Sequence, residues 1–412
     1  MSFTWWLSTS FSFLFGILQI NSCNLNYEKT STEENETTPD NEAQIVLTGA
    51  DQTQLYYPIL EGKRLGLVVN HTSVIGESHL VDSLLAAGFQ VKKVFAPEHG
   101  FRGTASDGSH IEDQKDARTG LPILSIYGKN KKPTKSQLEG IDLLLFDIQD
   151  VGLRCYTYTS TMTYVMEAGA ENGIPVLVLD RPNPNGHYFD GPILQRSNQS
   201  FVGLHPVPLI HGLTVGEYAN MINEEGWLNN DLKANLTVVA CKNYSHSSVY
   251  ELPIAPSPNL PNLRSIYLYP HLVLLEGSTY NLGRGTTKQF QVIGHPDDLN
   301  GEYTYTPISR PGAKYPKHQD QLCRGYDLTS LSIEALQNIQ ELDIDRILNL
   351  YQQFPEKDQF FREDNYFRLL AGTDELRKQI EALDKVQTIR ESWKNDLINY
   401  QRLRSKYLLY PE

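Results

Sequence analysis

The segment IDLLLFDIQDVGLRCYTY, residues 141–158, begins with an apolar run and continues into charged and amide side chains. The segment IPVLVLDRPNPNG at 174–186 repeats this arrangement, as do GLVVNHTS at 66–73 and KVFAPEHGFRG at 93–103. Apolar runs of about four to six residues, flanked by Gly or Pro, are typical of strands buried on both faces. The four segments therefore predict neighbouring strands of a parallel sheet.

Polar side chains follow each of these runs, at the carboxyl ends of the expected strands. Open α/β sheets bind their ligands in a crevice outside those ends. The residues that we expect to converge there are Asn70, Glu98, His99, Asp147, Asp150, Arg154, Asp180, Arg181 and Asn183. A structural ion pair is an equally supported interpretation of Asp147, Asp150 and Arg154.

Strand and helix patterns alternate between residues 44 and 205. We expect strands at 45–48, 65–69, 91–96, 122–126, 142–147 and 175–180. We expect helices at 79–87, 134–139 and 159–172. Gly88 and Gly173 follow the first and last of these helices, and glycine in that place is a stop signal. The alternation predicts an α/β fold, with a Rossmann-like N-terminal domain around a parallel sheet.

Residues 206–412 show a different pattern of expected elements, which predicts a C-terminal α+β domain. Thr214 and Glu217 form a capping box at the start of a helix over 214–225. A strand is expected at 236–241, and the proline-rich stretch 253–265 is expected to lack regular structure. Further helices are expected at 266–275, 333–352 and 373–405.

Residues 1–23 form an uncharged, apolar leader that ends at Cys23. Such a leader is typical of a secretory signal, and residues 20–23 are similar to a bacterial lipobox. A plain cleaved signal and an uncleaved anchor are the alternatives. Residues 24–43 hold six acids and one lysine and predict an acidic disordered tether. We therefore expect an exported lipoprotein, periplasmic or outer-membrane-associated, whose membrane contact is a lipid on Cys23.

Charge and motif content exclude several classes of function. The formal net charge of −13 is opposite in sign to what a nucleic-acid binder needs. The chain contains no GxxxxGK[ST] phosphate loop, no Gly-x-Ser-x-Gly nucleophile elbow and no HExxH metal motif. The sequence therefore predicts no nucleotide, metal or other cofactor. Cys155 lacks a convincing histidine partner, and we interpret it as a packing residue.

Glu98 follows Pro97 at a buried strand end, where burial disfavours the charged form of a carboxyl group. A carboxyl group in that position can act as a general acid, or it can simply anchor its loop. Glu276 begins the glycine-rich segment EGSTYNLGRGT at 276–286, which also holds Arg284. If this segment reaches the strand ends, the two glutamates form a carboxylate pair of the kind that hydrolyses glycosides.

Six motifs carry a more specific signal. They are NHTS (70–73), FAPEHGFRG (95–103), LLFDIQDVGLRCYTYTSTM (144–162), LDRPNPNG (179–186), PSPNLPN (256–262) and EGSTYNLGRGT (276–286). In this order they strongly resemble the exo-β-N-acetylmuramidase family (NamZ-like), formerly a domain of unknown function. The resemblance extends over residues 44–412.

The resemblance implies an active site between a Rossmann-like domain and a C-terminal α+β domain. It implies release of non-reducing terminal N-acetylmuramic acid from peptidoglycan fragments, without a metal or nucleotide. By their motif positions, the implied catalytic residues are Glu98, Glu276 and His99. The implied substrate-binding residues are Asn70, Asp147, Asp150, Arg154, Asp180, Arg181, Asn183 and Arg284. An arginine suits the lactyl carboxylate that distinguishes muramic acid from glucosamine.

The loop after Glu276 departs from the family pattern. Thr279, Tyr280 and Asn281 stand where the family usually has Asn-Val-Ser, so the asparagine is displaced by two positions. This departure bears on fine specificity more than on the type of reaction. Two alternative functions stay open at this point, a non-catalytic cell-wall carbohydrate-binding lipoprotein and an exo-glycosidase for a different sugar.

Overall fold

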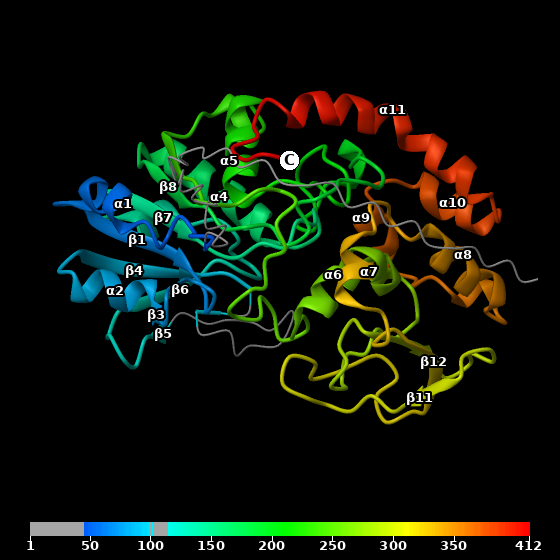
Figure 1. Ribbon diagram of the computed structural model, residues 1–412. Coiled ribbons are helices and arrows are strands. Elements are labelled where there is room, and N and C mark those ends of the chain that lie inside the picture. The colour runs from blue at the N-terminus through cyan, green and yellow to red at the C-terminus, as the bar shows by residue number, and fades with distance from the viewer. Residues whose placement is uncertain (1–44, 99, 102–113) are drawn as a thin grey trace, which may run out of the picture. The chain divides into compact units, whose positions relative to one another are not determined.

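The computed structural model describes residues 45–98, 100–101 and 114–412 (Figure 1). Its central sheet has seven strands in the order β5-β6-β4-β1-β7-β8-β9. Six of them are parallel: β1 (Arg64–Val69), β4 (Gln90–Ala96), β6 (Pro122–Ser125), β7 (Leu143–Asp147), β8 (Val176–Leu179) and β9 (Leu236–Val239). The edge strand β5 (Gln114–Lys115) is antiparallel, and β2 (Val74–Ile75) and β3 (Ser78–His79) form a separate hairpin.

Helices cover both faces of this sheet, which explains why its strands are apolar throughout. In β7, Leu143 and Leu145 pack toward α1 (Thr53–Leu60) and α2 (Leu80–Ala86). The alternate residues of β7, Leu144 and Phe146, belong to the opposite core. That core includes α4 (Tyr158–Asn172) and α5 (Val215–Glu224), and α3 (Lys135–Leu138) packs beside α4.

The remaining elements belong to the C-terminal half of the chain. α6 (Leu263–Leu272) continues directly into the 3-10 helix η3 (Val273–Gly277). A small antiparallel sheet follows, in the order β10-β12-β11, formed by β10 (Val292–His295), β11 (Tyr303–Tyr305) and β12 (Cys323–Asp327). The last helices are α7 (Ile333–Gln337), α8 (Ile344–Gln353), α9 (Tyr366–Ala371), α10 (Glu375–Glu381) and α11 (Val386–Arg404). Short 3-10 turns are η1 (Arg196–Asn198), η2 (Asn229–Asp231) and η4 (Lys357–Gln359).

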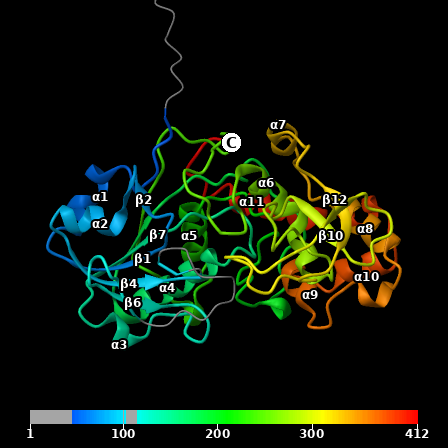
Figure 2. The same cartoon turned by 90° about the horizontal axis from the view of Figure 1, so that it is seen from below.

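One hydrophobic core joins the two halves of residues 45–412. It runs from Phe146 in β7 and Met162 in α4 to Leu274 in η3 and Ile347 in α8. In Figure 2 the sheet with α1 and α2 lies on one side, and α8 to α10 lie on the other. Among the described residues, no helix has the length and apolar character needed to cross a membrane.

The predicted fold class, a Rossmann-like parallel sheet followed by a C-terminal domain, is confirmed. Five of the predicted N-terminal strands and the later one at 236–241 are present as β1, β4, β6, β7, β8 and β9. β9 pairs with β8 in the same sheet, although it follows residue 205, where we placed the domain boundary. The boundary itself stays a prediction.

Several local predictions were wrong. Residues 45–48 form only one bridge pair, Leu47 with Lys242, because the backbone turns at Gly49, whose N–H donates to the Asp180 carbonyl. Helix α1 was missed, since Pro58 interrupts its pattern. The helix expected over 333–352 is divided into α7 and α8.

A buried ion pair connects the ends of two central strands. Asp147 ends β7, and Arg181 follows β8; Nε lies 2.5 Å from Oδ1, and Nη2 donates to Oδ2 at 2.9 Å. Their side chains are 0% and 3% exposed. Arg181 also donates to the Val74 carbonyl at 3.0 Å, so its guanidinium connects the strand ends to the β2–β3 hairpin. This geometry is the bidentate arrangement in which arginine binds carboxylate best.

We expect Asp147→Ala to lower the free energy of unfolding by about 3–5 kcal/mol, because it leaves the Arg181 charge buried and unpaired. Asp142→Ala is the matched control, since Asp142 stands just before the same strand and pairs with Arg64 at 2.7 Å on the surface. Exposed pairs contribute little, so the control should lose far less stability. Urea denaturation measures both variants, and equal losses would contradict the role of the buried pair.

Candidate active site

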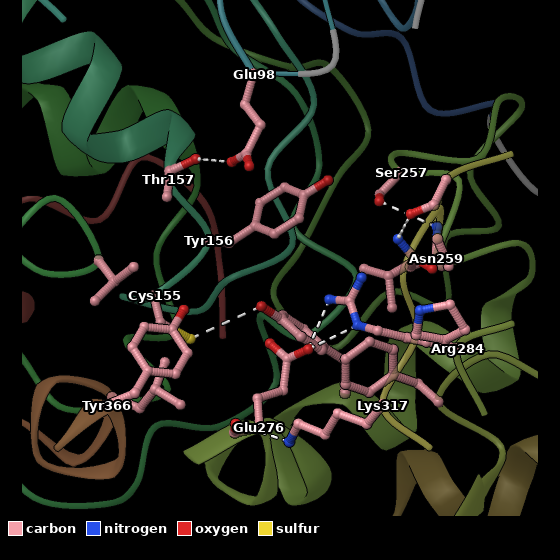
Figure 3. Close-up of a pocket in the computed structure, with 18 of the residues that line it drawn as sticks. Glu98, Cys155, Tyr156, Thr157, Ser257, Asn259, Glu276, Arg284, Lys317 and Tyr366 are labelled. Atoms are coloured by element: carbon pink, nitrogen blue, oxygen red, sulfur yellow. Dashed lines mark hydrogen bonds and ion pairs between the residues drawn. The ribbon is translucent and has the colours of Figure 1, made fainter. Parts of the chain in front are cut away.

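A cavity of about 860 Å³ lies between the carboxyl ends of the sheet and the C-terminal half. Glu98, which follows β4, and Thr157, the residue before α4, contribute from the sheet side. Glu276 in η3 and Arg284 contribute from the other side. Figure 3 shows Glu98 and Glu276 on opposite parts of this cavity, both directed into it. The motifs that contain Glu98 and Glu276 are far apart in the sequence, and they line the same cavity.

Two hydroxyl groups orient the Glu98 side chain. The phenol of Tyr127 donates to Oε1 at 2.6 Å, and Oγ1 of Thr157 donates to Oε2 at 2.8 Å. The hydroxyl of Tyr158 donates to the Glu98 carbonyl at 3.4 Å. Burial, together with the neighbouring Glu98 charge, raises the pKa of Tyr127, so this phenol stays a hydrogen-bond donor. Glu98 is thus held as an acceptor at both oxygens.

Arg284 orients the second carboxyl group, Glu276. Its Nε donates to Oε1 at 2.8 Å, and its Nη2 lies 2.6 Å from the same oxygen. Burial raises the pKa of Glu276 to about 7, and the Glu98 charge acts in the same direction. The charges of Lys317 and Arg362 act against this shift. These two contacts with Arg284 both reach Oε1.

Lys317 lines the cavity and is a residue that we did not predict from the sequence. Its Nζ donates to the carbonyl oxygens of Glu276 at 3.0 Å, Ser278 at 2.6 Å and Tyr280 at 3.1 Å. These carbonyls belong to the end of η3 and the loop after it, where a helix leaves acceptors unsatisfied. A lysine there compensates the negative end of the helix, although burial lowers the pKa of its ammonium group. No motif surrounds Lys317, so only the fold could identify it.

Aromatic and apolar side chains form the inner part of the cavity. Tyr156, Tyr269 and Phe290 line it, together with Cys155. Burial raises the pKa of the Cys155 thiol to about 12. The thiol is therefore neutral at physiological pH, which agrees with the interpretation of Cys155 as a packing residue.

Seven other residues predicted for the site each make polar contacts within the protein, and none belongs to the described lining of the cavity. They are Asn70, Asp147, Asp150, Arg154, Asp180, Arg181 and Asn183. Their proposed part in substrate binding stays a prediction. Their observed contacts hold the strand ends and the loops that follow them.

Three of these residues illustrate such contacts. Arg154 donates three hydrogen bonds of 2.8–3.0 Å to backbone carbonyls, one of them on Leu370 in α9. Asp180 accepts from the backbone N–H of Gly216 at 2.7 Å and from the hydroxyl of Tyr410. Asn70 donates to the hydroxyl of Tyr158 at 3.0 Å. Asn70 therefore supports the same tyrosine that holds the Glu98 backbone.

The remaining two residues, Asp150 and Asn183, also make contacts within the protein, although Oδ1 of Asp150 is buried without a hydrogen-bond partner among the described residues. Asp150 accepts from the Gly152 N–H at 2.7 Å, and Asn183 donates to the Leu213 carbonyl at 2.9 Å. His99 lies outside the described residues. Within the described part of the chain, no group of three or more His, Cys, Asp and Glu side chains is arranged to hold a metal ion.

The loop residues that depart from the family pattern are structural in this chain. The Tyr280 hydroxyl donates to Asp298 at 3.0 Å. Asn281 donates through Nδ2 to the carbonyls of Arg284 at 3.1 Å and Lys317 at 2.9 Å. The displaced asparagine thus closes the loop that presents Arg284.

Comparison with known proteins extends over both halves of the chain. The N-terminal pattern of the exo-beta-N-acetylmuramidase NamZ matches residues 65–264, and its C-terminal pattern matches residues 267–410. The peptidoglycan beta-N-acetylmuramidase NamZ of Bacillus subtilis (strain 168) is 39% identical over 373 residues, which are 86% of this chain and 89% of that protein.

Two crystal structures of DUF1343 family proteins from Bacteroides fragilis NCTC 9343 have the same fold. One has a TM-score of 0.83 and 46% identity, covering 90% of this chain and all of that one (100%). The other has a TM-score of 0.76 and 29% identity, covering 89% of this chain and 99% of that one. The family resemblance of the motifs is confirmed: the chain belongs to the exo-β-N-acetylmuramidase NamZ family of glycoside hydrolases.

Proposed function

We propose that this protein is an exo-acting glycoside hydrolase that releases non-reducing terminal N-acetylmuramic acid from peptidoglycan fragments. The observation that carries the proposal is the meeting of Glu98 and Glu276 in one cavity. Glycosidases use two carboxyl groups across the scissile bond, one to protonate the leaving oxygen and one to act on the sugar. Membership of the NamZ family supports the choice of sugar.

The environments of the two glutamates favour different roles. The raised pKa of Glu276 keeps a proton available near neutral pH, and this carboxyl group can deliver it to the glycosidic oxygen as the bond breaks. Glu98, which accepts hydrogen bonds at both oxygens, is suited to act on the anomeric centre, directly or through water. The leaving saccharide takes the proton from Glu276, and water supplies the hydroxyl group of the released sugar. The other proton of that water passes to the glutamate that acts as the base, from which the proton of Glu276 is restored.

Cations in the cavity fit the carboxylate of muramic acid. The described lining includes four cations, Arg284, Lys314, Lys317 and Arg362, and two glutamates, although the chain as a whole carries a formal charge of −13. Arg284 is the cation that we propose for the lactyl carboxylate, since a guanidinium can serve two acceptors at once. Export and lipidation at Cys23 complete the proposal, and they rest on the sequence of residues 1–43 alone.

We expect Glu98→Gln and Glu276→Gln each to lower kcat by about 10²–10⁴-fold, the usual contribution of a positioned acid or base. The measurement is release of N-acetylmuramic acid from the disaccharide N-acetylmuramyl-N-acetylglucosamine. Glu61→Gln, on an exposed glutamate outside the described lining of the cavity, is the matched control and should keep wild-type activity. Full activity in either cavity variant would remove that residue from the mechanism.

The pH profile tests which glutamate is the acid. A carboxyl group with a raised pKa is protonated below that pKa, so kcat/KM should fall as the pH rises through about 7. Arg362→Gln removes a charge that lowers the pKa of Glu276, so the alkaline limb should move to higher pH. An alkaline limb that stays in place in Arg362→Gln would argue against Glu276 as the proton donor.

A further inference from the structure

Residues 312–317 form one border of the cavity and differ from the rest of its lining. Most lining side chains are buried or half-buried, whereas Lys314 and Tyr315 are exposed. Tyr315 is 81% exposed, an unusual state for so large an aromatic side chain. Exposed side chains of a lining lie where the cavity meets solvent, so this border, which we call the 312–317 rim, is at the opening.

The rim is held firmly against the loop that carries the catalytic machinery. Lys317 binds the carbonyls at the end of η3, as described above, and its own carbonyl accepts from Asn281 at 2.9 Å. Nε2 of His318 lies 2.7 Å from the Thr279 carbonyl. These contacts fix the C-terminal end of the rim to the segment between Glu276 and Arg284.

The N-terminal end of the rim is equally restrained. The backbone groups of Arg310 and Ala313 exchange two hydrogen bonds of 3.0–3.1 Å, which close a tight turn around Gly312. Asn259, which also lines the cavity, donates to the Gly312 carbonyl at 3.0 Å. Tyr315 is therefore an exposed side chain on a restrained backbone, which is what a preformed contact surface requires.

The chemistry of the exposed ring points to a sugar. The ammonium of Lys314 lies 5.3 Å from the centre of the Tyr315 ring, on the electron-rich face that attracts cations. The C–H groups on a pyranose face are also partly positive, and they pack on an aromatic face for the same reason. A neutral amino sugar provides such a face without a charge that Lys314 would repel.

The position of the rim decides which sugar it contacts. An exo-acting enzyme takes the terminal sugar into its cavity, and the rest of the substrate must extend through the opening. Glu276 and Arg284 act on the terminal sugar, and the rim is joined to their loop at the solvent side. The sugar on the leaving side of the scissile bond is therefore the part of the substrate that passes the rim.

From these observations we infer that Tyr315 is a stacking platform for the leaving-group sugar, an N-acetylated amino sugar next to the scissile bond. The inference rests on the proposed function and extends it to a second subsite. It predicts that the enzyme prefers substrates whose leaving group is a sugar. Derivatives of muramic acid whose leaving group is small should be poorer substrates. Tyr315 is thus a specificity-determining residue that acts outside the terminal-sugar site.

The test compares Tyr315→Ala with wild type on two ligands. For N-acetylmuramyl-N-acetylglucosamine, KM should rise about threefold to tenfold, the range expected for loss of one aromatic stacking contact. Inhibition by free N-acetylmuramic acid, which occupies only the terminal-sugar site, should not change. Tyr315→Phe keeps the ring and should behave as wild type. Leu322→Ala, at another exposed apolar residue (66%) outside the lining, is the control for a general surface effect.

The outcomes separate this inference from the proposed function. Wild-type protein that releases no N-acetylmuramic acid would overturn the proposed function and the subsite with it. An active wild type whose KM is unchanged by Tyr315→Ala would overturn the subsite alone. Equal weakening of the disaccharide and of free N-acetylmuramic acid would also overturn it, because the ring would then act on the terminal sugar or on the loop.

Discussion

The structure depends on one constraint, the burial of polar groups at the carboxyl ends of the central strands. In an open α/β sheet these ends usually face a crevice. Here most of the polar side chains that follow these strands are buried, and a buried polar group without a partner is costly. Two sets of contacts pair such groups. One is the ion pair between Asp147 and Arg181, and the other is the three hydrogen bonds that Arg154 donates to backbone carbonyls. Among the described residues, Glu98 after β4 and Tyr127 after β6 reach the lining of the cavity.

The same constraint explains how far the sequence could predict the site. Apolar runs and their polar ends predicted the parallel sheet, because burial on both faces leaves a clear pattern. They could not distinguish a polar group facing substrate from one facing another loop, since both follow a strand in the same way. Glu98 and Asp180 look alike in the sequence, yet Glu98 lines the cavity and Asp180 binds Gly216 and Tyr410.

Residues that reach the site only through tertiary contacts could not be predicted from the sequence. Tyr127 donates to Glu98 from the segment after β6, and Lys317 reaches η3 across about forty residues of loop and small sheet. Neither stands in a motif or in a periodic pattern. The sheet β10-β12-β11 was missed for a related reason, since its strands are short and two of them, β11 and β12, are only partly buried. Glu276 and Arg284 were found because a glycine-rich loop marks them.

The contact between Tyr410 and Asp180 has a consequence for the order of folding. The two residues are 230 positions apart, and Tyr410 also accepts a hydrogen bond from the Cys241 backbone. During synthesis the sheet strands emerge from the ribosome long before Tyr410 does. Until then Asp180 lacks one of its partners, and the carboxylate must stay hydrated or bind elsewhere. Closure of the core around Asp180 therefore waits for the segment that carries Tyr410.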